Sequence, residues 1–377
     1  MIEPPSLLTT RLDHIAANVR AVAEHTGALV LVAVKANAYG HGAVEVSRAL
    51  AGVADALGVA TVTEGVQLRQ AGITAPILKL SVARGAEVAL AVAHGLELVV
   101  IDEPSIAEAA AASVAAGTTT RLHLKVDTGM RRIGCEPDEA VGLARFADAT
   151  AGVELVGLMS HLPISDAPEG VDFTREQIAL FGRVAADVEA ARGPLCKHLA
   201  NSGGVLAHPE SWFDMVRPGV MAYGYYPDPD VPRSVPLLPG LEWRSRVVFT
   251  KPVRAGESVS YGRTWTAPRD GWLATVPIGY GDGYSRLLSN RGRMLVGGRS
   301  YPIAGRVCMD QTMVFLGSDG AGAGESGTGV AVGDEVVLIG RSDGQEITVA
   351  EIAGLMGTIP YEVTCLVNAR VAREFRA

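Results

Sequence analysis

The chain has 377 residues, of which 48% are hydrophobic and 20% charged, and its formal net charge is −8. This length predicts two or three domains. The negative charge without a basic stripe argues against nucleic acid binding. No apolar stretch approaches the roughly 18 residues that a membrane helix needs. The start lacks a signal-peptide pattern, and four scattered cysteines without a CxxC pair are typical of reduced thiols in a cytoplasmic protein.

From residue 10 to about residue 230, short apolar runs alternate with alanine-rich stretches of helical spacing. The predicted strands are Leu29–Val34, Ala56–Ala60, Pro76–Leu80, Leu96–Ile101, Arg121–Val126, Leu155–Ser160, Lys197–Ala200 and Met215–Val220. The predicted helices include Leu12–Ala23, Ala43–Ala51, Val62–Ala71, Ser105–Ala116 and Phe173–Ala191. Eight such alternations predict an α/β fold, a closed TIM-like (β/α)8 barrel. A doubly wound open sheet is the alternative, but no GxGxxG follows the first strand.

The sequence changes character after the proline-rich stretch Tyr226–Pro239. Short runs rich in valine, threonine and aromatic residues then alternate with glycine turns, which predicts a mainly β domain. These runs are Val247–Thr250, Trp272–Pro277, Arg293–Val296, Tyr301–Ile303, Thr312–Phe315 and Glu335–Ile339. The glycine-rich run Gly317–Gly333 is predicted to form a flexible hairpin loop. We therefore assign residues 1–235 to the barrel and residues 236–377 to the β domain.

The first predicted strand lies in the segment Leu29–Gly42 (LVLVAVKANAYGHG) and is followed directly by Lys35. A lysine at the mouth of a buried strand is poorly solvated, and desolvation favours its neutral, nucleophilic form. Such a lysine can attack a carbonyl, as in the Schiff bases that lysines form with pyridoxal phosphate. Tyr39 follows four residues later, where its phenol could reach a bound ligand. For an isolated lysine, a strand-end side chain extending to solvent is the favoured interpretation, so other residues must decide.

Further polar residues follow other predicted strands. In (β/α)8 barrels the active site lies at the C-terminal ends of the strands, and phosphate often binds after the last two. The strand ends here carry Lys35, Lys125, His161, Ser202 and Arg217. Glycines in Asn201–Gly204 and Pro218–Val220 let backbone N–H groups approach an anion. The sequence thus predicts a lysine and an anion site at one barrel mouth, although each residue singly also fits an ordinary structural role.

These residues fall in blocks that resemble one known family. Val34–Gly42 (VKANAYGHG) is similar to the cofactor-lysine signature of alanine racemases, pyridoxal phosphate enzymes with a barrel and a β domain. Other matching blocks are Lys125–Gly134 (KVDTGMRRIG), Asn201–Gly204, Arg217–Gly219, Tyr261–Trp265 (YGRTW), Tyr280–Gly283, Gly305–Gln311 (GRVCMDQ) and Pro360–Glu362. The first block also fits other members of the fold, whereas YGRTW and CMDQ are more specific. The resemblance extends through nearly the whole chain.

The resemblance implies a role for each matching residue. Lys35 forms the internal aldimine with pyridoxal 5'-phosphate, and Tyr261 of a partner subunit is the second base. The phosphate is held by Tyr39, Ser202, Tyr361 and the backbone of Gly219 and Val220. Arg217 faces the pyridine nitrogen, and His161 stacks beside the ring and belongs, with His198, to the network around Arg217. Arg132 and the Met309 backbone hold the substrate carboxylate, and Lys125 is a candidate for carbamylation.

The implied function is interconversion of L-alanine and D-alanine, supplying D-alanine for bacterial peptidoglycan. Racemisation needs a proton removed from one face of Cα and delivered to the other, and a lysine and a tyrosine on opposite faces can do this. Arg217 stays charged and so keeps the pyridine nitrogen unprotonated, which makes the ring a poorer electron sink. The implied assembly is a cytoplasmic homodimer with shared active sites, and no metal, membrane or nucleic acid partner.

Four alternative functions remain open. A serine or broader-specificity racemase would share the chemistry and differ only in its pocket. An amino-acid decarboxylase of the same architecture is disfavoured by YGRTW, and a non-catalytic cofactor-binding barrel by the large β domain. A metal-dependent barrel hydrolase could use carbamylated Lys125 with His161, His198 and Asp310, but it would normally show an H-x-H pair after its first strand, and this chain has none.

Overall fold

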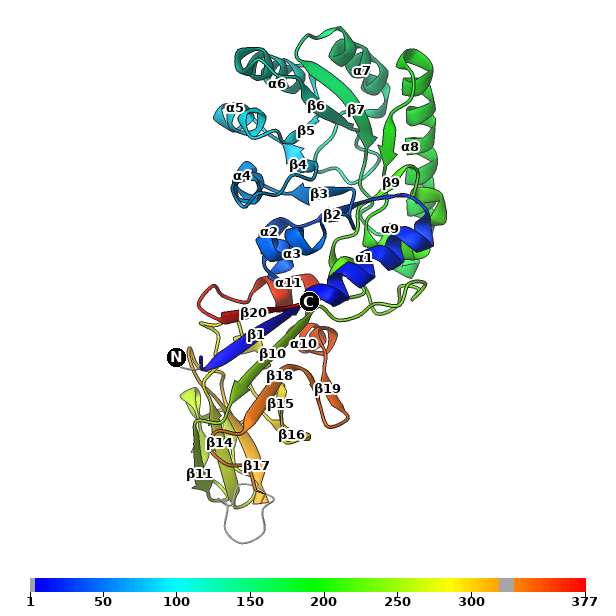
Figure 1. Ribbon diagram of the computed structural model, residues 1–377. Helices are drawn as coiled ribbons and strands as arrows, with labels where there is room; N and C mark the ends of the chain where they lie inside the picture. The colour runs from blue at the N-terminus through cyan, green and yellow to red at the C-terminus, as the bar shows by residue number, and fades with distance from the viewer. Residues whose placement is uncertain (1–3, 319–328) are drawn as a thin grey trace. The chain divides into compact units, whose positions relative to one another are not determined.

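The computed structural model describes residues 4–318 and 329–377, which divide into two compact units (Figure 1). One unit, the barrel unit, is Asp13–Leu238, and the other, the β unit, combines Met1–Leu12 with Pro239–Ala377. Most of the predicted loop Gly317–Gly333 lies outside the described residues. Within the described ranges, none of the helices has the length and apolar character needed to cross a bilayer.

The barrel unit contains an eight-stranded parallel sheet in the order β8-β7-β6-β5-β4-β3-β2-β9. The strands are β2 (Leu29–Ala33), β3 (Ala56–Val59), β4 (Ile77–Val82), β5 (Glu97–Val100), β6 (Thr120–Lys125), β7 (Val153–Met159), β8 (Cys196–His198) and β9 (Met215–Val216). Beside the seam between β8 and β9, Asp214 N donates to Lys197 O at 3.1 Å and Arg217 N to Ala200 O at 2.9 Å. The sheet is therefore nearly closed, which confirms the predicted barrel and excludes the doubly wound sheet.

Helices connect the strands and lie outside them, as α4, α5 and α6 do in Figure 1. The helices are α1 (Leu12–Thr26), α2 (Lys35–Tyr39), α3 (Ala43–Ala49), α4 (Val62–Gln70), α5 (Ala86–Ala93), α6 (Glu103–Ala116), α7 (Ala140–Ala149), α8 (Val171–Arg192) and α9 (Ser202–Ala207). The 3-10 turns of this unit are η1 (Pro137–Glu139), η2 (Pro168–Gly170), η3 (Pro209–Ser211) and η4 (Val220–Tyr223). Local sequence fixes where two of the helices begin, since capping boxes start α4 at Thr61 and α6 at Asp102.

A cluster of apolar side chains links the strands of the barrel. It consists of Leu31, Ala56, Leu78, Val99, Met159 and Met215, with Leu80, Ile101 and Cys196 packed against it. Burying each large side chain contributes about 1.5–3 kcal/mol. Because the cluster draws on seven of the eight strands, it holds the strand ends in a fixed arrangement, and the residues that follow those ends inherit that arrangement.

The described residues of the β unit form three sheets. The largest has the strand order β16-β15-β18-β10-β1-β20, with β19 paired to β18, and the others are β11-β14-β17 and β12-β13. The strands are β1 (Ser6–Arg11), β10 (Leu241–Arg246), β11 (Phe249–Val253), β12 (Ser258–Val259), β13 (Trp265–Thr266), β14 (Gly271–Val276), β15 (Arg293–Val296), β16 (Arg299–Pro302), β17 (Thr312–Gly317), β18 (Glu335–Ser342), β19 (Gln345–Ile347) and β20 (Ala372–Arg376). Its helices are α10 (Val349–Met356) and α11 (Pro360–Cys365), and its 3-10 turns are η5 (Tyr261–Arg263) and η6 (Arg286–Leu288).

The first twelve residues differ from the sequence-based assignment, which placed them with the barrel. β1 pairs antiparallel with β10, where Leu8 lies opposite Trp243, and parallel with β20, where Leu8 lies opposite Arg373. The chain therefore begins in the β unit before it enters the barrel unit through α1. The segment SLLTTR gives no clear periodic signal, and its partners lie more than 200 residues away in sequence, so local pattern could not assign it.

Candidate active site

The chain turns into a left-handed conformation immediately after Lys35. Ala36, Asn37, Ala38 and Tyr39 have φ angles of 50°, 55°, 54° and 53°. For residues with a side chain this conformation costs about 1–2 kcal/mol each. Strain of this kind persists only where the surrounding structure determines the backbone, and it concentrates at functional sites. Tyr39 thus follows β2 in a direction that an ordinary right-handed helix would not give.

Hydrogen bonds on both sides hold this left-handed turn. The carboxylate of Glu64 accepts from Ala36 N at 2.7 Å, and the side-chain oxygen of Asn37 accepts from Ala43 N at 2.9 Å. Glu64 is itself fixed by the capping box at the start of α4. Its charge-assisted bond to Ala36 N offsets part of the strain. The neighbouring strand and helix therefore help to fix the backbone position of Lys35.

A small polar cradle forms where three connections of the barrel meet. The side chain of Tyr39 is buried and packs so closely on Gly219 that a Cβ there would lie 2.6 Å from the phenol oxygen. Ser202 Oγ accepts from Gly219 N at 3.0 Å and from Met221 N at 3.4 Å. No acceptor for its hydroxyl proton is found in the part of the chain that the structure describes, so this proton is available to a ligand. The structure thus brings Tyr39, Ser202 and Gly219 together, with Val220 next to Gly219 in the chain.

Arg217 is buried and contacts no carboxylate among the described residues. Its Nη2 donates to Ser160 O at 2.6 Å and to Leu199 O at 3.0 Å, and its Nη1 lies 3.1 Å from His198 Nδ1. His161 Nδ1 lies 3.5 Å from Nη2. Burial lowers the pKa of Arg217 to about 10, which leaves the guanidinium charged at neutral pH. The Nε–H and one Nη1–H have no protein partner among the described residues and remain available to a ligand.

Positive charge concentrates beside Arg217. Lys125, Asp127, Arg132, Ser160 and His161 are among the residues that line a pocket at the ends of β6 and β7. Burial first, and then the charges of Arg217 and Arg132, lower the pKa of Lys125 to about 8. Burial and the same cations hold the pKa of His161 well below its ordinary value, so this imidazole is neutral.

The charge balance of the pocket indicates what it binds. Lys35, Lys125, Arg132 and Arg217 all act on His161, whereas the one acidic side chain that lines the pocket is Asp127. Like charges held close together repel, and a bound anion relieves that repulsion. A ligand that carries a phosphate and a carboxylate fits this donor set, with a lysine amine for a carbonyl carbon. The barrel residues therefore fit pyridoxal phosphate together with an amino acid.

Three predicted site residues lie in the β unit. Tyr261 is 72% exposed and stands in the turn η5, and Met309 is 53% exposed. Ser260 Oγ donates to Arg306 O at 2.7 Å, which connects the Tyr261 turn to the segment that leads to Met309. Tyr361 lies in the first turn of α11.

Sequence reasoning missed several residues that support the site. Glu64 carries no signal beyond its capping box. Arg370 contacts Asp282 at 2.7 Å and Asp310 at 2.7 Å, and so ties down the loop that carries Met309. Glu97 and His123 form a buried chain with His198, described below. Among the described residues, no group of three His, Cys, Asp or Glu side chains could hold a metal ion.

Comparison with known proteins decides the family. The model of the alanine racemase N-terminal domain matches residues 10–227, and that of the C-terminal domain matches residues 240–375. The chain is 48% identical over 373 residues to the alanine racemase of Cutibacterium acnes, covering 98% of this chain and 97% of that protein. The chain belongs to the alanine racemase family.

Solved structures agree with this membership. An alanine racemase from D-cycloserine-producing Streptomyces lavendulae matches with a TM-score of 0.91 at 35% identity, covering 100% of this chain and 98% of that chain. A histidine racemase from Leuconostoc mesenteroides matches with a TM-score of 0.89 at 30% identity, covering 100% and 99%. The prediction of an alanine racemase, a pyridoxal phosphate-dependent isomerase, is therefore confirmed.

Proposed function

We propose that the chain interconverts L-alanine and D-alanine, with Lys35 and Tyr261 as the two groups that exchange protons with Cα. The observation that supports this most directly is the excess of cations around the barrel pocket, of which Lys125 and Arg217 are buried, because it fits an anionic cofactor and substrate together. Pyridoxal phosphate, when bound, delocalises the electron pair left on Cα as its proton departs. The chain's own residues must then hold both molecules and move the proton.

Separate groups of residues hold the cofactor. Lys35 provides the amine for its aldehyde carbon. Tyr39, Ser202 and the backbone of Gly219 and Val220 would bind its phosphate, and the family resemblance implies Tyr361 as a further phosphate ligand. Arg217 would donate an N–H to the ring nitrogen, and His161 would pack beside the ring. A charged guanidinium has only donors, so it can donate to an unprotonated ring nitrogen but cannot accept the N–H of a protonated one, and it would therefore favour the unprotonated ring.

The substrate carboxylate is held by Arg132 and by the backbone N–H of Met309. With the carboxylate fixed, Lys35 and Tyr261 approach Cα from opposite faces. One removes the proton and the other delivers one, and their roles exchange in the reverse direction. This two-sided exchange distinguishes racemisation from a reaction that returns the proton to the same face.

We also propose that Lys125 is carbamylated. With its pKa lowered to about 8, an appreciable fraction of its amine is neutral near neutral pH. The nitrogen lone pair attacks the carbon of CO2, an N–C bond forms, and one proton is released. The product carries a negative charge beside Arg132, which compensates the local excess of cations and orients that guanidinium toward the substrate.

The active site is proposed to be complete only in a homodimer. Tyr261 and Met309 are both largely exposed in the chain as described, although proton transfer and carboxylate binding both require a desolvated setting. A symmetric dimer in which each β unit contributes Tyr261 to the other protomer's barrel would cover them and create two equivalent sites.

Mixing two inactive variants tests this shared site. Lys35→Ala and Tyr261→Ala should each be nearly inactive as homodimers. In a heterodimer, one site carries both lesions and the other carries neither, so activity should rise toward one wild-type site per heterodimer. If native mass spectrometry shows heterodimers and activity does not recover, both residues act within one chain and the shared-site proposal is wrong.

A broader substrate range is the second candidate, as either a serine or a multi-substrate racemase. The similarity to a histidine racemase at 30% identity supports it, since the same fold and a similar sequence carry a different substrate name. Racemisation assays with alanine, serine and histidine decide between the two, and comparable kcat/KM for all three would contradict alanine specificity.

The biological role proposed for the chain is supply of D-alanine for bacterial peptidoglycan, in the cytoplasm. Family membership supports the role, and four free cysteines are consistent with a reducing compartment. Deleting the gene should make growth depend on added D-alanine, and growth without it would contradict this role unless another racemase is present.

A further inference from the structure

A buried line of four polar side chains runs between strands of the barrel. Glu97 Oε2 lies 2.9 Å from His123 Nε2, His123 Nδ1 lies 2.9 Å from His198 Nε2, and His198 Nδ1 lies 3.1 Å from Arg217 Nη1. The residues come from β5, β6, β8 and the end of β9. The line therefore connects the start of a strand, at Glu97, with the guanidinium at the C-terminal end of the barrel.

Chemistry permits only one order of donors along this line. A guanidinium can only donate, so His198 Nδ1 accepts and its proton resides on Nε2. That N–H donates to His123 Nδ1, and the proton of His123 therefore resides on Nε2, where it donates to Glu97. Both imidazoles are neutral in this order. Burial, and then Arg217, hold the pKa of His198 well below its usual value, in agreement with a neutral ring.

The protonation state of Glu97 agrees with this order of donors. Burial opposes ionisation of Glu97, but the hydrogen bond from His123 and the charges of Arg121 and Arg69 lower its pKa. Glu97 is therefore a carboxylate, which can only accept. Arg121 Nε lies 3.3 Å from its other oxygen, on a side chain that is 54% exposed. The line thus has an obligate acceptor at one end and an obligate donor at the other.

The barrel makes room for this line at one backbone position. A Cβ on Gly157 would lie 2.1 Å from His123 Nδ1, the atom that receives the proton of His198. Gly157 lies opposite His123 in the pairing of β6 with β7, where the register shifts. A side chain at position 157 would displace the ring, so the space for His123 depends on this glycine.

We propose that Glu97 and His123 are positioning residues that act through His198 to fix the orientation of Arg217. Without the acceptor at Glu97, His123 is free to hold its proton on Nδ1, and His198 must then turn its own proton toward Arg217. Two donors would face each other, and the guanidinium would have to move. Two of its donors, Nε–H and one Nη1–H, would then no longer point in a fixed direction.

This inference rests on the proposed function, in which Arg217 serves the cofactor ring. The two can be separated by experiment. If the role of Arg217 is wrong, Arg217→Glu leaves racemisation and the cofactor absorbance unchanged. If only the positioning role is wrong, Arg217→Glu changes both, while changes at Glu97 change neither.

The test compares three variants of the holoenzyme. Glu97→Met removes the acceptor, Glu97→Gln keeps an oxygen that can accept from His123, and Arg121→Gln removes only the exposed ion pair. Each variant is loaded with pyridoxal phosphate, and histidine side-chain 15N NMR reports the tautomers of His123 and His198. The fraction of bound cofactor and its absorbance are measured before kcat and KM.

In Glu97→Met, we expect that the protons of His123 and His198 no longer both reside on Nε2. The cofactor absorbance should shift, and kcat should fall by up to about a hundredfold. Glu97→Gln should restore the order and most of kcat, and Arg121→Gln should match wild type. Unchanged tautomers and kcat in Glu97→Met would overturn the proposal, as would an equal loss in Glu97→Gln. The wild-type spectrum alone is decisive if Glu97→Met does not fold, because an imidazolium or an Nδ1–H form at His123 or His198 contradicts it.

Discussion

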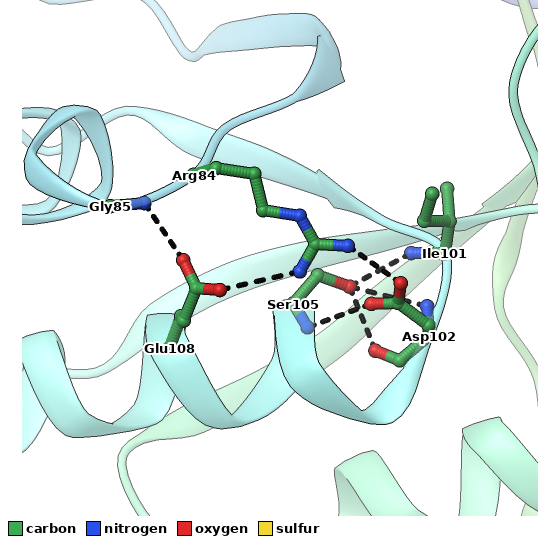
Figure 2. A network of polar contacts seen from close by, with 6 residues as sticks. All are labelled: Arg84, Gly85, Ile101, Asp102, Ser105 and Glu108. Atoms are coloured by element: carbon green, nitrogen blue, oxygen red, sulfur yellow. Dashed lines mark hydrogen bonds and ion pairs between the residues drawn. The ribbon is translucent and has the colours of Figure 1, made fainter.

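Two arginines in the barrel unit differ in the groups that surround their charge. Arg84, between β4 and α5, is 40% exposed and lies 2.6 Å from Asp102 and 3.4 Å from Glu108 (Figure 2). Arg217 is buried and donates to carbonyls and an imidazole. The hydrogen bond with Asp102 raises the pKa of Arg84, whereas burial lowers that of Arg217.

The carboxylates around Arg84 also serve the backbone. Asp102 accepts from Ser105 N at 2.8 Å and so caps α6, and Glu108 accepts from Gly85 N at 2.9 Å. Figure 2 shows these side chains turned toward one another across two neighbouring connections. We call this cluster closed because the carboxylates of Asp102 and Glu108 balance the charge of Arg84. Its main function is to join α5 and α6. A cation without a carboxylate, as at Arg217, is instead available to a ligand.

The largest effect should come from reversing the charge of Arg217. Arg217→Glu removes the obligate donor and places an acid where it can protonate the ring nitrogen. We expect racemisation to fall by at least about a hundredfold, as when one preorganised electrostatic group is removed, and transamination to rise. Racemisation of alanine and formation of the pyridoxamine cofactor are measured together. The matched control is Arg84→Glu, and equal losses in both variants would mean that the two arginines do not differ in function.

The buried cations should also make the stability of the apoprotein depend on pH. In the folded chain the pKa of Lys125 is about 8, and in the unfolded chain it is about 10.4. Between these pH values the unfolded state binds more protons, so the free energy of unfolding rises with pH. The difference is worth about 3 kcal/mol across this window, at about 1.4 kcal/mol for each pKa unit.

Denaturant unfolding of the CO2-free apoprotein, from pH 7 to pH 10.5, measures this rise against a Lys125→Met variant. Wild type should gain about 3 kcal/mol relative to the variant. Carbamylation would replace the titrating amine, so adding bicarbonate should flatten the difference. Identical pH profiles for the two proteins in the absence of CO2 would show that Lys125 is not perturbed.

The same contrast explains how much could be predicted from the sequence. The barrel was predictable because each strand and the helix after it are local, and Lys35, Ser202 and Arg217 follow strand ends where such barrels place their sites. Glu97 and His123 were not predictable, since their meeting depends on contacts between strands. The left-handed turn after Lys35 also left no signal, because alanine, asparagine and tyrosine do not specify that conformation.

A smaller effect is expected at the capping residue of the closed cluster. Asp102→Ala removes the oxygen that accepts from Ser105 N and should lower the free energy of unfolding by about 1 kcal/mol. Asp102→Asn keeps an acceptor and should retain most of that stability. Thermal unfolding of both variants separates the cap from the ion pair. A loss in Asp102→Asn as large as in Asp102→Ala would assign the stabilisation to the charge of Asp102 instead.

The smallest effect should come from Arg84 itself. Arg84→Gln removes two ion pairs that are exposed to solvent, and such pairs contribute from about 0 to 1 kcal/mol. A double-mutant cycle with Asp102→Asn isolates the pair, and its coupling energy should decrease as salt is added because both groups lie near the surface. Alanine racemisation should not change, since the balanced charge of this cluster leaves nothing for a ligand to complete. A salt-independent coupling above about 2 kcal/mol, or a tenfold loss of kcat, would place Arg84 among the functional cations and remove the distinction drawn between closed and open clusters.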